Sequence, residues 1–175
     1  MKKLLTVTAL AFISTALFAQ TKWNLDNTHS SVNFTVTHLV ISEVDGTFKK
    51  FTGNVSAPNA DFTDAAVDFS VDINSINTDN EMRDNHLKSD DFFNAAQYPN
   101  MTFKSTSFKK VSGNKYQLKG NLTIRDVTKP ITFDVTYGGT VKDPWGNIKA
   151  GFKATGTINR FDYNLKWNNM TEAGG

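Results

Sequence analysis

The chain has 175 residues, with 19 lysine and arginine residues against 17 aspartate and glutamate residues, and no cysteine. Without cysteine it can form neither disulfide bonds nor a reactive thiolate, so its fold must depend on a hydrophobic core. Residues 1–19 carry two lysines and no acid, which leaves 17 basic and 17 acidic residues in the remainder. That balance offers no basic surplus for binding nucleic acid.

The first 19 residues have the composition of a signal peptide. Lys2 and Lys3 precede an uncharged apolar stretch from Leu4 to Phe18, and the small residue Ala19 follows. The stretch is short for a membrane span, and no stop-transfer pattern comes after it, although an uncleaved membrane anchor is the alternative. We therefore expect cleavage near Ala19 and a periplasmic or secreted protein.

Most of the remaining chain alternates apolar and polar residues with a period of two, the pattern of strands with one buried face. This predicts strands over residues 31–38, 67–73, 116–125, 131–137 and 148–158, and another that holds Met101 and Phe103. In the stretch 44–55 the apolar residues change from even to odd positions, which predicts a β-bulge or sharp bend at Lys49-Lys50. Strong curvature or close backbone approach is expected at four glycines: Gly46, Gly53, Gly120 and Gly156.

One segment has the features of a helix. Residues 81–88 contain no glycine, proline or β-branched residue, and Thr78 with Glu81 fits a capping box. A second short helical turn is expected from Ser89 to Phe93.

A long antiparallel sheet with one apolar face needs either a second sheet or closure upon itself. Several of the predicted strands are longer than the usual strand of an immunoglobulin-like sandwich, so their length favours a barrel. The sequence therefore predicts an all-β antiparallel β-barrel of about eight strands, with one short helical excursion. It forms a single domain over residues 20–175.

Few residues are arranged for chemistry. The three histidines, His29, His38 and His86, do not match compact zinc-site spacings, so we expect no metal site. His29 and Ser30 would point to opposite faces of a strand, and the chain lacks a Gly-x-Ser-x-Gly nucleophile motif. The sequence therefore predicts no catalytic residue and no cofactor.

Aromatic residues are abundant, with fourteen phenylalanines, three tryptophans and four tyrosines. They either fill a solid core or line an apolar tube that holds a ligand. The sequence leaves both readings open.

Five stretches together resemble the YceI-like proteins, the lipid/polyisoprenoid-binding family. The most distinctive is Arg83-Asp84-x-His86-Leu87-Lys88-Ser89-x-Asp91-Phe92-Phe93, which Tyr98-Pro99-x-Met101-x-Phe103 follows. The others lie in residues 23–38, 44–53, 120–130 and 158–163, so the resemblance covers nearly all of the chain after residue 20. Members of that family usually continue into a final strand, so we expect that the closing strand is missing here.

The resemblance implies a lipocalin-like barrel with an elongated pocket for an isoprenoid lipid, a quinone or a similar amphiphile. It implies a non-enzymatic protein that stores or transports this ligand, with a transient membrane contact and a homodimer as open alternatives. The candidate ligand-binding residues are Phe34, Val36, His38, Phe69, Val71, Ile73, Arg83, His86, Phe92, Phe93, Phe103, Leu122, Ile124, Phe133 and Arg160.

Arg83, His86 and Arg160 match positions of the family motifs, where they would either meet a lipid head group or tie the helix to the barrel. Two other functions stay open. One is an enzyme that acts on such a lipid, with His38, His86 or Arg83 as its reactive group. The other is a structural β-domain whose interior is filled.

Overall fold

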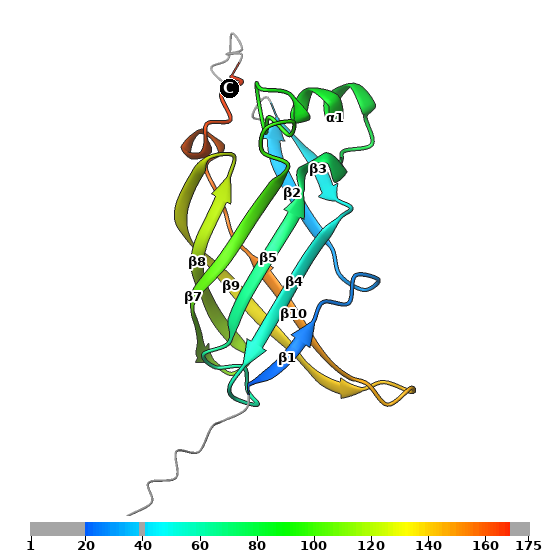
Figure 1. Ribbon diagram of the computed structural model, residues 1–175, viewed down its shortest axis with the longest axis vertical. Coiled ribbons are helices and arrows are strands. Elements are labelled where there is room, and N and C mark those ends of the chain that lie inside the picture. The colour runs from blue at the N-terminus through cyan, green and yellow to red at the C-terminus, as the bar shows by residue number, and fades with distance from the viewer. Residues whose placement is uncertain (1–19, 39–40, 169–175) are drawn as a thin grey trace, which may run out of the picture.

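The computed structural model of the protein describes residues 20–38 and 41–168, which form a curled antiparallel sheet with one short α-helix (Figure 1). The strands are β1 (Thr21–Asn24), β2 (Val32–His38), β3 (Ser42–Phe48), β4 (Phe51–Ala57), β5 (Ala66–Asp72), β6 (Ile76–Asn77), β7 (Asn100–Ser112), β8 (Lys115–Ile124), β9 (Val127–Lys142) and β10 (Ile148–Thr155). Helix α1 spans Glu81–Lys88, and two 3-10 turns, η1 and η2, span Ile73–Ser75 and Arg160–Tyr163.

Seven strands form the main sheet in the order β1-β4-β5-β7-β8-β9-β10, and β2, β3 and β6 form a smaller sheet. In the described part of the chain the edge strands β1 and β10 do not pair with each other, so the main sheet is a half-barrel. The prediction of an all-β antiparallel barrel-like fold is confirmed. The last predicted strand ends at Thr155 rather than at residue 158, and Ile73 begins the η1 turn rather than ending β5.

The change of parity in residues 44–55 is explained by a change of sheet. β3 pairs with β2 and β6 in the small sheet, whereas β4 pairs with β1 and β5 in the main sheet. Between them the chain bends at Lys49, whose backbone N–H donates to the carbonyl of Ser75 at 3.0 Å. The predicted irregularity at Lys49-Lys50 is therefore a sharp bend between two sheets.

Helix α1 has the predicted limits but not the predicted cap. Its N-cap is Asn80, whose side chain accepts a hydrogen bond from the backbone N–H of Arg83 at 3.0 Å. Thr78 is buried instead, and its hydroxyl donates to the Asp84 carboxylate at 2.6 Å. The predicted capping box was wrong, because the Thr78 side chain is buried beside the helix and its hydroxyl bonds to Asp84 and Arg83 instead of capping the helix. Residues 89–93 form a bend and a turn, as predicted.

The inner face of the main sheet carries the larger of two hydrophobic clusters. It includes Phe103, Leu118, Leu122, Ile124 and Val135 from β7, β8 and β9, and Tyr163 and Leu165 cover its helix end. A smaller cluster around Phe48, Val71 and Ile73 fills the space between the two sheets and the segment that holds α1. The core therefore follows the concave side of the half-barrel and continues under the helix.

Phenylalanine rings lie directly over strand glycines of neighbouring strands. In the main sheet the Phe69 ring covers Gly53, the Phe103 ring covers Gly120, and the Phe133 ring covers Gly156 just beyond β10. A Cβ atom built on Gly120 would lie 2.4 Å from the Phe103 ring and 2.5 Å from the carbonyl oxygen of Lys104. These glycines let the rings approach the backbone of the neighbouring strand closely, as the strand patterns predicted.

Substituting Gly120→Ala should lower the free energy of unfolding by about 1–3 kcal/mol, because the new methyl group overpacks ring and backbone atoms that cannot both move away. Urea denaturation measures the change. Gly151→Ala in β10 is the matched control, since a Cβ there meets no atom within 4 Å. Equal losses for both variants would contradict this account of the Gly120–Phe103 contact.

Candidate functional site

The inner face of the main sheet brings together six of the predicted ligand-binding residues: Phe69, Val71, Phe103, Leu122, Ile124 and Phe133. The register supports this placement, because Phe69 is opposite Phe103, and Phe103 is opposite Leu122. Directly paired residues of antiparallel strands point to the same face. The alternation in the sequence therefore identified the apolar face correctly.

Three more of these residues belong to the smaller cluster. Phe34 lies over Gly46 and packs against Phe48, Ile73 is 1% exposed, and the Phe93 ring contacts Phe48 edge-on at 6.1 Å. Val36 does not join them, because it is 47% exposed on β2. The side chain of His38 lies outside the described residues.

The sequence did not identify an aromatic cluster at the end of the sheet opposite α1, where the turns of the β7–β8 and β9–β10 hairpins lie. Phe62, from the loop after β4, is 2% exposed and has a φ of 64°. This ring contacts Trp23 at 5.1 Å, Tyr137 at 5.7 Å and Phe152 at 4.9 Å. A loop residue in the left-handed region that turns inward leaves no periodic signal, so strand patterns could not reveal it.

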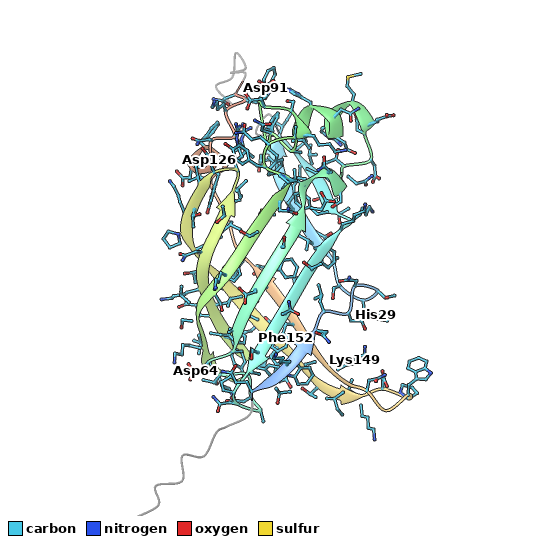
Figure 2. The ribbon with its side chains drawn as sticks, viewed as in Figure 1. His29, Asp64, Asp91, Asp126, Lys149 and Phe152 are labelled. Atoms are coloured by element: carbon cyan, nitrogen blue, oxygen red, sulfur yellow. The ribbon has the colours of Figure 1, made fainter. Side chains whose placement is uncertain are left out.

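Apolar side chains remain exposed along β10, one of the two edge strands of the main sheet. Figure 2 labels Phe152 on this strand, and it is 41% exposed. Ile148 at the start of β10 is 52% exposed, and beyond the strand Ile158 and Phe161 are 41% and 47% exposed. We call these four residues the β10 strip. Ile148 and Phe152 lie on the same face of β10 as Ala154. Because Ala154 is opposite the core residue Val135, this is the inner face of the sheet.

Two hollows lie on the surface of the described structure. The larger, of about 270 Å³, is lined mostly by polar side chains such as Lys49, Ser70 and Asp72. The smaller, of about 210 Å³, lies at the β7 irregularity between Ser105 and Ser107. Neither presents the apolar walls that a lipid tail requires.

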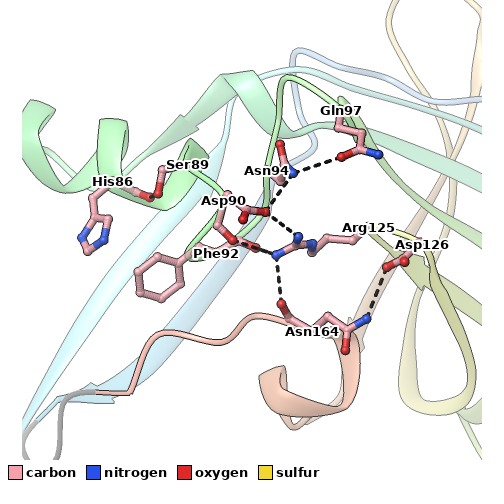
Figure 3. A network of polar contacts seen from close by, with 9 residues as sticks. All are labelled: His86, Ser89, Asp90, Phe92, Asn94, Gln97, Arg125, Asp126 and Asn164. Atoms are coloured by element: carbon pink, nitrogen blue, oxygen red, sulfur yellow. Dashed lines mark hydrogen bonds and ion pairs between the residues drawn. The ribbon is translucent and has the colours of Figure 1, made fainter.

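Arg125, in the turn between β8 and β9, organises the helix end of the half-barrel (Figure 3). Its side chain is 7% exposed, and one guanidinium nitrogen donates to three carbonyl oxygens, those of Asp90, Phe92 and Asn164, each at 2.9 Å. A second nitrogen pairs with the Asp90 carboxylate at 2.8 Å. Arg125 thus joins the segment after α1 to the segment after η2. The alternation of residues 116–125 places Arg125 on the polar face of the predicted strand, so the sequence did not indicate its burial.

The three predicted polar residues also have partners within this end of the chain. Arg83 donates from Nε to the Thr78 hydroxyl at 2.7 Å, and Arg160 lies over the rings of Phe92 and Phe161. His86 Nε2 is 2.9 Å from the Asp91 carboxylate. These contacts favour the interpretation that the three residues position the helix.

His86 also connects the helix to the segment that follows η2. Its ring meets Phe92 edge-on at 5.1 Å and Trp167 at 4.6 Å. The backbone N–H of Trp167 donates to the carbonyl of Asp91 at 3.1 Å. No group of three or more metal-ligating side chains occurs among the described residues.

An ion pair connects the loop after β1 to β10 across the unpaired edges of the sheet. The Asp26 carboxylate lies 2.8 Å from Lys149 Nζ and 3.1 Å from His29 Nδ1 (Figure 2). The Lys149 ammonium and the His29 ring hold the pKa of the Asp26 carboxyl far below its ordinary value of 3.8. The same contact raises the pKa of Lys149 above 10.5. His29 lies in this loop rather than in a strand, and its partner is Asp26 rather than Ser30.

The comparisons with known proteins agree on one family. The family model described as a YceI-like domain matches residues 23–174. Protein YceI of Salmonella newport is 39% identical over 161 residues, which are 91% of this chain and 84% of that protein. A crystal structure of the Campylobacter jejuni YceI protein has 38% identity and a TM-score of 0.66, over 81% of this chain and 82% of that one. The crystal structure of Burkholderia cenocepacia BcnA has 27% identity and a TM-score of 0.71, over 79% and 83%.

Replacing Arg125 by alanine should lower the free energy of unfolding by about 3 kcal/mol, because three carbonyl oxygens lose a charged donor at a mostly buried position. Amide hydrogen exchange at Asn164 and Leu165 should accelerate as well. Asp90→Asn is the matched variant and should cost less than about 1 kcal/mol, because the Asp90 side chain is 71% exposed. Equal losses of unfolding free energy in the two variants would mean that the Arg125–Asp90 ion pair, and not the hydrogen bonds to the carbonyls, provides the stabilisation.

Asp26→Asn should destabilise the fold in a pH-dependent way. Because the folded-state pKa of Asp26 is depressed, its stabilisation is present above the ordinary value of 3.8 and is lost as the pH falls toward the folded-state pKa. On the alkaline side the raised pKa of Lys149 means that the stabilisation is lost above 10.5.

The difference in unfolding free energy between the wild type and Asp26→Asn should therefore be constant between about pH 5 and 9 and should shrink in acid. Denaturant titrations at several pH values measure it. Lys149→Gln should reduce the same acid dependence. A difference that stays constant down to pH 2 or so would contradict the role of this ion pair.

Proposed function

The chain belongs to the YceI-like family, and on that premise we propose that it binds an amphiphilic isoprenoid lipid or quinone along the inner face of its main sheet. It holds the ligand for storage or transport and catalyses no reaction on it. The observation that carries this proposal is the β10 strip, which leaves apolar side chains exposed beside the hydrophobic inner face.

The chemistry of the inner face suits a long apolar chain better than a compact polar ligand. This face is built of the rings of Phe69, Phe103 and Phe133 together with aliphatic side chains. Each CH₂ group removed from water contributes about 0.8 kcal/mol, so a prenyl chain of many such groups would gain enough to outweigh the cost of association. Lys129 is opposite Leu122 and therefore lies on this face, where its ammonium group pairs with the Asp162 carboxylate at 3.3 Å.

The polar residues near the helix favour binding over chemistry. Arg83 and His86 are two of the three candidate reactive groups of an enzyme acting on the lipid, the third being His38, and they bind Thr78 and Asp91. Their hydrogen bonds fix α1 and the segments beside it at one end of the inner face. We assign them the role of shaping that end of the site.

Export is part of the proposal. Residues 1–19 have the charge and apolar pattern of a signal peptide, and they lie outside the described structure. Cleavage there would release the protein into the periplasm or the medium. The described residues include no helix long and apolar enough to cross a membrane. A transient membrane contact would let such a protein collect or deliver its ligand, and a homodimer is a further alternative for its assembly.

The test is mass spectrometry of organic extracts from the protein purified out of its own host. Ala154→Trp should block the site, because Ala154 points inward opposite Val135 at an exposed position where the fold can accept a larger side chain. Lys153→Trp adds the same ring on the outer face opposite Thr136 and is the matched control. Val71, which is 3% exposed, is less suitable, because tryptophan there would disrupt the smaller cluster.

We expect about one equivalent of a prenyl lipid or quinone from the wild type and from Lys153→Trp, and a loss of most of it from Ala154→Trp. Extracts without such a lipid from all three proteins would favour a structural β-domain with a filled interior. Equal amounts from both variants would place the ligand elsewhere on the protein.

A further inference from the structure

The two ends of the half-barrel carry opposite charge. Helix α1 lies at one end, and the turns of the β7–β8 and β9–β10 hairpins lie at the other (Figure 1). At the helix end, residues 72–100, 124–127 and 156–168 contain eight carboxylates and five lysine or arginine residues. At the hairpin end, residues 20–26, 57–66, 109–115 and 141–149 contain six lysines and four aspartates.

Two of the four aspartates at the hairpin end are paired with lysines, which leaves four lysines against Asp61 and Asp143. Asp64 pairs with Lys109, and Asp26 pairs with Lys149. Asp143 accepts hydrogen bonds from the backbone N–H groups of Trp145 and Asn147, at 3.0 and 2.8 Å. By contrast, Lys22, Lys110, Lys115 and Lys142 form no ion pair within the described residues, so the hairpin end presents free positive charge.

The β9–β10 hairpin extends past its neighbour and exposes apolar side chains at its tip. Beside the β7–β8 turn, the backbone N–H of Tyr137 donates to the carbonyl of Asn114, and β9 continues from there to Lys142. Trp145 in the turn is 84% exposed, Val141 is 64% exposed and Ile148 is 52% exposed. The hairpin therefore projects from the body of the sheet (Figure 1), and the turn at its tip carries the exposed Trp145 side chain.

The turn that carries Trp145 is ordered by its own contacts. The Asp143 carboxylate binds Asn147 through both its backbone and its side chain, and Gly146 adopts a φ of 93° that favours glycine. Because the turn is already fixed, little conformational entropy is lost when its side chains enter a new environment. The Lys142 stem lies beside this turn, since a Cβ on Gly146 would be 3.8 Å from Lys142 Cε.

We propose that the hairpin end is a docking surface for an anionic lipid bilayer, with Trp145 entering the interface between head groups and acyl chains. Tryptophan favours that interface because its ring is apolar and its N–H is polar. Unpaired lysines are attracted to anionic head groups, while the acidic helix end is repelled, so the charge separation orients the molecule. A second copy docked tip to tip would bring like charges together.

This inference adds a surface and an orientation to the membrane contact within the proposed function, but it does not require a bound lipid cargo. Its test is cosedimentation of the full protein with vesicles of phosphatidylcholine alone or with added phosphatidylglycerol. We expect partition onto the phosphatidylglycerol vesicles that falls with rising salt. Trp145→Ala should weaken it roughly tenfold or more, and Lys110→Gln or Lys142→Gln roughly fivefold each.

Met82→Ala is the matched control, because Met82 is 83% exposed at the acidic helix end. It should leave the partition unchanged. Equal binding to both kinds of vesicle, or equal losses for Trp145→Ala and Met82→Ala, would overturn the proposal. So would a dimer that dissociates on Trp145→Ala without any vesicle binding. Lipid in the organic extracts reports on the inner face, so the two proposals can fail separately.

Discussion

The close approach of phenylalanine rings to strand glycines is the contact on which the shape of the main sheet depends. A ring that covers Gly53, Gly120 or Gly156 occupies the volume that a side chain on the same face would otherwise fill. The inner face can therefore curl tightly while its aromatic side chains stay close to the backbone of the neighbouring strands. Larger residues at these positions would push the rings toward the centre of the half-barrel and widen the sheet. The curvature and the smooth apolar wall are two consequences of one packing arrangement.

A curled sheet with an apolar inner face must be stabilised at both ends, and this protein uses different chemistry at each. At the helix end the Arg125 guanidinium binds backbone carbonyls from two separate segments, so a single side chain fixes the position of both. At the hairpin end the Phe62 ring packs among other aromatic side chains. The polar clamp requires nearly complete burial to be strong, whereas the aromatic packing gains from contact area alone. The geometry of the helix end is consequently fixed more strictly than that of the hairpin end.

These differences explain how much of the structure could be predicted from the sequence. Alternation identified the inner-face residues of β5, β7, β8 and β9, because each lies in a regular strand whose period is visible locally. The limits of α1 were also predicted, since residues 81–88 have consistent helix propensity. Arg125 and Phe62 could not be identified, because both lie at turn or loop positions with positive φ, where side-chain direction does not follow a period.

Contacts between distant parts of the chain were equally beyond local patterns. Asp26 and Lys149 are 123 residues apart, and their pairing depends on how the whole sheet curls. The capping box failed for a different reason, because the Thr78 hydroxyl donates to the Asp84 carboxylate and accepts a hydrogen bond from Arg83 Nε, both within α1. The pattern of residue types could not show which of these neighbouring groups the hydroxyl would bind.

The two proposed surfaces meet at one residue, which constrains how they would work together. Ile148 belongs both to the exposed tip of the β9–β10 hairpin and to the β10 strip, and Phe152 follows it on the same face. With the hairpin tip in the interface, the strip would begin at the level of the acyl chains and lead along β10 toward the inner face. A prenyl chain could then move from bilayer to protein without exposing its length to water, which would cost about 0.8 kcal/mol per CH₂ group. Placing the acidic helix end on the bilayer instead would leave the start of the strip in water, so the direction of the charge separation is the one that a lipid-transfer function requires.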